Sequence, residues 1–123
     1  MPYEVYKIIH LTGIIMTVVA LGGLSMHAIL GGQKKENPFR KPAMITHGVG
    51  LLFVLVAGFG MLARMGIHWP WPTWIIVKFT IWILFGAAAA LVYRKPVLSH
   101  GVWWGSVVLV ALAATMAIMK PFM

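Results

Sequence analysis

The sequence predicts an all-α integral membrane protein, a four-helix up-down-up-down bundle with both termini outside the cell. The first observation is composition: 61% of the 123 residues are hydrophobic and 10% are charged, against about 45–50% and about 25% in soluble domains. The second is four apolar runs, each with the roughly 20 residues that a helix needs to cross a hydrocarbon core about 30 Å thick. The third is short connections, which make successive helices antiparallel neighbours.

The four predicted spans cover about residues 5–30, 43–63, 74–93 and 100–119, so residues 1–123 are expected to form a single membrane domain. The first span is too long for a signal peptide, its start is not strongly basic and no A-x-A site follows it, so we expect it to be retained. The segment GGQKKENPFRKP joins the first two spans. Its glycines are typical of a helix C-terminus and its prolines of a helix start.

Lysine and arginine are unevenly distributed, and this predicts the orientation. The loops after the first and third spans share a side and hold six basic residues, against three or four on the other side. We therefore expect these loops to be cytoplasmic, in the inner membrane of a bacterium. The basic residues behind the net charge of +8 are then expected to interact with anionic lipid headgroups rather than with nucleic acid. The six residues are Lys34, Lys35, Arg40, Lys41, Arg94 and Lys95.

Tryptophans lie near the predicted span ends, where the headgroup region favours them. Trp69, Trp71 and Trp74 mark the outer side, and Trp103 and Trp104 mark the inner side. We interpret them as aromatic belts; stacking on a flat cofactor is the alternative.

Ionisable residues inside a span are costly and therefore indicate candidate functional sites. His10 lies five positions into the first span and Lys78 four positions into the third, and both spans run inward. Both residues should lie roughly 6–8 Å below the outer interface. Haem iron takes an imidazole readily; Lys78 can be a second ligand or pair with an anion. Alternatively, Lys78 extends to the headgroups, and His10 bonds a backbone carbonyl or Thr17 on its own helix face.

A second histidine cluster is predicted at the inner side. His27 lies near the end of the first span, His47 one turn into the second, and His100 opens the fourth. Neutral imidazole is the commonest protein metal ligand, so two of these histidines on facing helices can sandwich a haem. The alternative is that they are interfacial residues whose nitrogens are hydrated.

The residues that are missing narrow the function classes. Neither glutamate lies inside a span, which disfavours a transporter driven by an intramembrane carboxylate. There are no cysteines, which excludes disulfides, iron–sulfur clusters and covalent haem attachment. The many glycines of the spans allow close helix packing, either within the chain or against a partner or second copy.

Two segments carry a family resemblance. YKIIHLTGI and WIIVKFTIWILFGAA resemble parts of HemJ-type protoporphyrinogen oxidases and of related membrane proteins of the copper-resistance-D and SirB kind. That resemblance implies b-type haem, with His10 and Lys78 as the functional pair. The segment ENPFRKPAMITHGVGLLFVLVAGFG is similar to small four-span bacterial inner-membrane proteins of uncharacterised activity, which implies a fold and a compartment.

Two functions follow as expectations. The first is a b-type haem-binding membrane protein with a redox or tetrapyrrole-related role, in which His10 is an iron ligand and Lys78, His47 and His27 are further cofactor-binding candidates. The second is a non-enzymatic accessory subunit of a larger membrane complex, whose glycine-rich faces pack against partners. Transport of a small solute or metal is a third alternative.

Overall fold

The structure, a computed structural model, describes residues 2–119. Four long helices account for most of this range: α1 (Tyr3–Ile29), α2 (Arg40–Met65), α3 (Thr73–Arg94) and α4 (Ser99–Met119). Two short 3₁₀ helices, η1 (Lys34–Glu36) and η2 (Pro96–Leu98), lie in the connections, and the described range contains no strand. Each long helix is long and apolar enough to cross a membrane. The all-α four-span fold is therefore confirmed, and the protein is a multi-pass membrane protein.

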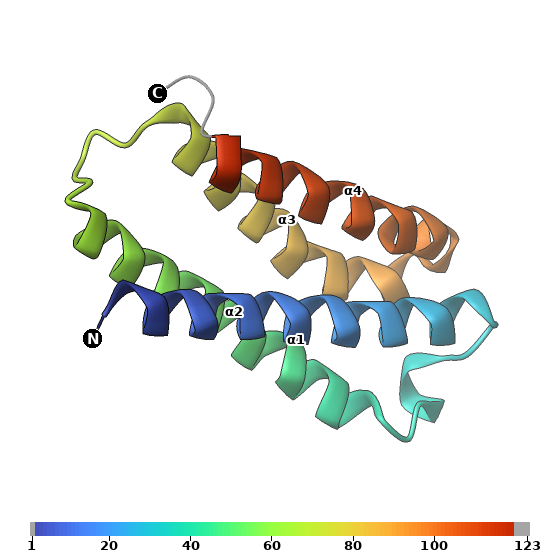
Figure 1. Cartoon of the computed structure of the whole chain (residues 1–123). Helices are drawn as coiled ribbons and strands as arrows, with labels where there is room; N and C mark the ends of the chain where they lie inside the picture. Colours follow the sequence, from blue (N-terminus) through green and yellow to red (C-terminus); the bar gives the residue numbers. More distant parts are fainter. Residues whose placement is uncertain (1, 120–123) are drawn as a thin grey trace.

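The helices alternate in direction (Figure 1). We call the end of the bundle that carries residues 30–39 and 95–98 the basic end. The segment between α2 and α3, the start of α1 and the end of α4 lie at the opposite end (Figure 1). The observed helix limits lie within three residues of the predicted spans. Which end faces the cytoplasm stays a prediction.

Glycines end the first two helices because each adopts a left-handed backbone conformation. Gly31 has φ 86° and Gly66 has φ 70°. In both cases the next residue donates its backbone N–H to a carbonyl five positions earlier: Gly32 to His27 at 2.9 Å, and Ile67 to Leu62 at 3.0 Å. This pattern satisfies carbonyls that a helix C-terminus would otherwise leave unpaired.

The closest helix contact in the bundle joins α1 and α2, which cross where two glycines meet (Figure 1). A Cβ atom added to Gly13 would lie 2.7 Å from the carbonyl oxygen of Gly50, and one added to Gly50 would lie 2.8 Å from the carbonyl oxygen of Gly13. Small residues let helix backbones approach and gain dispersion contacts that lipid cannot replace. These two glycines therefore fix the crossing point.

The crossing has approximate two-fold symmetry, and the sequence carries the same symmetry as an internal repeat. The pattern HxxGxxxxxVAxxG begins at His10 and again at His47. Added Cβ atoms at Gly13 and Gly50 would also approach equivalent backbone nitrogens, those of Val54 and Thr17, each at 2.9 Å. Because the two helices are antiparallel, they form an inverted repeat about an axis close to the membrane plane.

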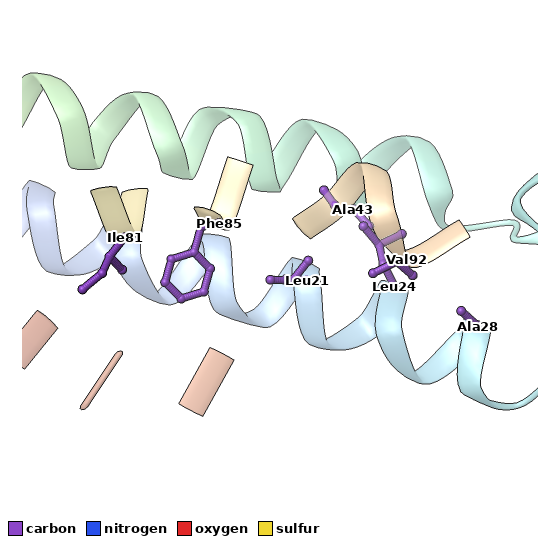
Figure 2. Close-up of a cluster of buried hydrophobic side chains, with 8 residues drawn as sticks. Leu21, Leu24, Ala28, Ala43, Ile81, Phe85 and Val92 are labelled. Atoms are coloured by element: carbon purple, nitrogen blue, oxygen red, sulfur yellow. The ribbon is translucent and has the colours of Figure 1, made fainter. Parts of the chain in front are cut away.

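The other helices pack on this pair through two apolar clusters. The larger cluster joins α1 and α3, with Ala43 of α2 at its edge (Figure 2). The smaller one, Trp74, Ile75 and Met116, joins α3 to α4 at the end opposite the basic end. Helix α4 buries only Ser99, Ser106 and Met116, so most of its surface faces outward. The members of the larger cluster are Leu21, Leu24, Ala28, Ala43, Ile81, Phe85, Ala89 and Val92.

Candidate functional site

His10 lies inside the bundle, with 8% of its surface exposed. Its Nδ1 atom is 2.9 Å from the backbone carbonyl oxygen of Val54 on α2. A carbonyl only accepts hydrogen bonds, so Nδ1 carries the proton. In a neutral imidazole the other nitrogen, Nε2, then has the free lone pair. Metal-binding histidines characteristically show this arrangement, in which one ring nitrogen donates to a carbonyl and the other faces the metal.

A hydrogen bond to a backbone carbonyl was the expected alternative for His10, but this carbonyl belongs to α2 and not to the helix of His10. Thr17 does not bind His10; its hydroxyl donates to the carbonyl of Gly13 at 2.8 Å. Val54 stands at the position of the repeat that corresponds to Thr17. The Gly13–Gly50 crossing brings the α2 backbone within reach, so the glycines and the histidine form one structural unit.

Lys78 lies on α3 and is partly buried. Helix α3 packs on α1 through the larger apolar cluster, so His10 and Lys78 belong to two helices in contact, and their common depth stays a prediction. Whether either residue binds a cofactor stays a prediction.

His47 is the repeat equivalent of His10, but it faces a different helix. It is 3% exposed, and its Nε2 atom is 3.1 Å from the carbonyl oxygen of Phe85 on α3. The indole nitrogen of Trp82 on α3 donates in the reverse direction, to the carbonyl of Leu51 on α2, at 2.9 Å. These two bonds connect α2 to α3, as the His10 bond connects α1 to α2.

His27 belongs to a third polar group, at the basic end. Asn37 donates to the hydroxyl oxygen of Tyr93 at 2.9 Å, and the same oxygen is 2.9 Å from Nδ1 of His27. The Tyr93 hydroxyl therefore joins His27 of α1 to Asn37 in the connection before α2.

The expected cluster of His27, His47 and His100 does not come together as a metal site. Within residues 2–119 no group of three or more His, Asp or Glu side chains is placed to hold a metal ion. His100 is exposed on α4, while His27 and His47 have separate partners on α3.

The outer tryptophans divide between two roles. Trp69 is 74% exposed and Trp74 is 4% exposed, so Trp74 belongs to the protein interior and not to a lipid-facing belt. Trp71 packs on Trp69, with ring centroids 5.3 Å apart, and on Phe59 and Phe79 at 5.7 and 6.5 Å. The contacts continue from Phe79 to Trp82 at 5.7 Å. Ring contacts between aromatic side chains thus connect α2 and α3 near the end opposite the basic end.

Sequence reasoning missed Val54, Tyr93 and Asn37 as partners of the histidines. Val54 contributes only its backbone, so its side chain carries no signal. The HxxG repeat was the available signal, because it predicts that the two helices pack symmetrically.

Comparisons of the chain with protein-family models, with curated proteins and with solved structures give no match. Function is therefore inferred from the side chains themselves.

Proposed function

We propose that this multi-pass membrane protein resides in the bacterial inner membrane and binds b-type haem through Nε2 of His10, with a redox or tetrapyrrole-related role. The single observation that carries the proposal is the hydrogen bond from Nδ1 of His10 to the Val54 carbonyl. It holds the ring in the tautomer whose other nitrogen can bind iron. The resemblance of the segments around His10 and Lys78 to HemJ-type oxidases supports the same pair.

The donor set fits haem. An imidazole anchored by a carbonyl is a strong iron ligand, and Lys78 would act as a second ligand or neutralise a propionate. When bound, haem supplies one-electron chemistry. The protein contributes the anchored imidazole, the lysine charge and an apolar surrounding that excludes water.

Room for the porphyrin has to come from α3. The His10 ring is largely covered, so a flat macrocycle must displace side chains packed on it. Helix α3 packs on α1 through larger apolar side chains, whereas α1 and α2 meet directly at the backbones of Gly13 and Gly50. We therefore expect α3 to move outward on haem binding while the α1–α2 crossing stays fixed.

Visible absorption spectroscopy tests this proposal. Protein purified from cells supplied with the haem precursor 5-aminolevulinic acid should show a Soret band that shifts on reduction with dithionite. His10→Ala should abolish the band, whereas His47→Ala, the repeat-equivalent variant, should retain it. Equal loss of the Soret band in both variants would show that the band depends on folding and not on iron ligation by His10.

The second candidate is a non-enzymatic accessory subunit of a membrane complex. It is favoured by α4, whose outward surface includes Gly101 and Gly105, with open space where their Cβ atoms would lie. Small residues at this spacing suit packing against another helix in lipid. Co-purification with other membrane proteins at a fixed stoichiometry that Gly105→Leu destroys would support it, and a colourless monomer in mild detergent would count against both candidates.

A further inference from the structure

A groove lies between α1 and α2 near the basic end, with a volume of about 290 Å³. Beyond their crossing, α1 and α2 diverge toward this end of the bundle (Figure 1). On the α1 side, the residues that line the groove are Val19, Ala20, Gly23 and His27. On the other side they are Asn37, Phe39, Ala43 and Thr46.

The groove is open to the surroundings of the bundle. Val19 and Phe39 on its rim are 66% and 67% exposed, whereas Ala20 and Ala43 on its floor are buried. Gly23 has nothing within 4 Å of the place where its Cβ would lie. At 1.5 Å per residue, the α1 side runs about 12 Å, from the end of the helix into the hydrocarbon region. This part of the groove is narrow, apolar and accessible from lipid.

The end of the groove nearest the membrane surface is polar and positively charged. His27 lines this end of the groove, and its Nδ1 atom is hydrogen-bonded with the Tyr93 hydroxyl. Phe39, on the rim, is followed directly by Arg40 and Lys41, which line a neighbouring hollow. The basic end carries six basic residues and one acidic residue, Glu36. Its net positive charge is complementary to an anion.

We infer that this groove binds one anionic phospholipid. One acyl chain lies along Gly23 and between Val19 and Phe39, and the phosphate is held near His27 and the cations that open α2. The volume is slightly below the range of about 300–1,000 Å³ typical of sites for drug-sized ligands, which suits a single chain rather than a flat macrocycle. This site is separate from His10 and does not depend on haem.

Lipid retention measured by native mass spectrometry tests the inference. The full chain is reconstituted in nanodiscs of phosphatidylcholine containing phosphatidylglycerol, then released and its bound lipids are counted. The wild type should retain one phosphatidylglycerol in preference to phosphatidylcholine. Gly23→Leu, which fills the groove, should lower this retention at least about tenfold. Gly48→Leu is the matched control, because Gly48 is also helical, exposed and without neighbours at its Cβ position, and it should retain the lipid.

A charge-removal pair provides an independent readout if Gly23→Leu disturbs the fold. The double variant Arg40→Gln/Lys41→Gln should weaken retention about twentyfold, since each cation near an anionic surface contributes a factor of about five. The control Arg94→Gln/Lys95→Gln removes the same charge from the other loop and should change retention less than about threefold. Equal effects of the two double variants would overturn the inference.

Competition with soluble anions distinguishes a site that binds a whole lipid from a site that binds only its headgroup. Inorganic phosphate and glycerol phosphate at millimolar concentration should fail to displace the lipid, whereas dioctanoyl phosphatidylglycerol should displace it. Displacement by inorganic phosphate at the same concentration would show that the site recognises a phosphate and not a lipid. Retention by Gly23→Leu equal to that of the wild type would show that the chain lies elsewhere.

Discussion

Replacing Gly13 with alanine should break the contact on which the α1–α2 pair is built. The new Cβ would lie 2.7 Å from the Gly50 carbonyl oxygen, 2.8 Å from Cβ of Phe53 and 2.9 Å from the Val54 nitrogen. These atoms are fixed by the backbone, so no rotamer change relieves the overlap. Restoring ordinary contact, which begins near 3.4 Å, requires the helices to separate by about 0.7 Å at the crossing.

The same separation affects His10, which lies one turn from Gly13. Its bond to the Val54 carbonyl, now 2.9 Å, would lengthen to about 3.6 Å and cease to be a hydrogen bond. Overpacking costs about 1–3 kcal/mol, and a buried donor left without a partner costs about 1–3 kcal/mol. We expect a combined loss of about 2–6 kcal/mol in the free energy of unfolding.

Unfolding in mixed micelles by sodium dodecyl sulfate, followed by the fluorescence of the six tryptophans, measures this loss. Gly48→Ala is the control, because its Cβ would meet nothing within 4 Å. Each glycine-to-alanine change raises helix propensity by about 1 kcal/mol. The difference in the free energy of unfolding between the two variants therefore reports only the effect of the overlap at the helix crossing. Equal stability of Gly13→Ala and Gly48→Ala would refute the close contact and with it the anchoring of His10.

Three further changes probe the other polar contacts. Tyr93→Phe removes the hydroxyl shared by Asn37 and His27 and should lower the free energy of unfolding by about 1–2 kcal/mol in the same titration; an unchanged midpoint would contradict the network. Trp82→Phe removes the donor to the Leu51 carbonyl and should cost about 1 kcal/mol, whereas Trp104→Phe, at an exposed position, should cost less than about 0.5 kcal/mol. Lys78→Arg should preserve the absorption spectrum of bound haem if Lys78 neutralises a propionate and alter it if Lys78 is an iron ligand; a spectrum unchanged in both Lys78→Arg and Lys78→Met would exclude Lys78 from the site.

The spans could be predicted because the bilayer imposes a length on every crossing helix, and this requirement appears directly as apolar runs between loops. The end of α1 could be predicted from its glycines, since Gly31 adopts the left-handed conformation that closes the helix; Gly66 does the same for α2. The common level of His10 and Lys78, which comes from counting residues from the span ends, stays a prediction.

Helix rotation could not be predicted in the same way. All four helices are apolar on every side, so hydropathy does not distinguish the face toward lipid from the face toward a neighbour. The partners of His10 and His47 are backbone carbonyls on other helices, and their positions depend on the crossing. The same ambiguity made Trp74 look like a lipid-facing belt residue although it is buried.

The most direct test of the central claim, that His10 binds haem, is the haem content per chain, measured by the pyridine haemochrome method on protein purified after growth with 5-aminolevulinic acid. We expect a stoichiometry close to one for the wild type and for His47→Ala, and near zero for His10→Ala with its fold intact by circular dichroism. A folded wild-type protein free of haem, or a folded His10→Ala variant with full haem content, would contradict the assignment.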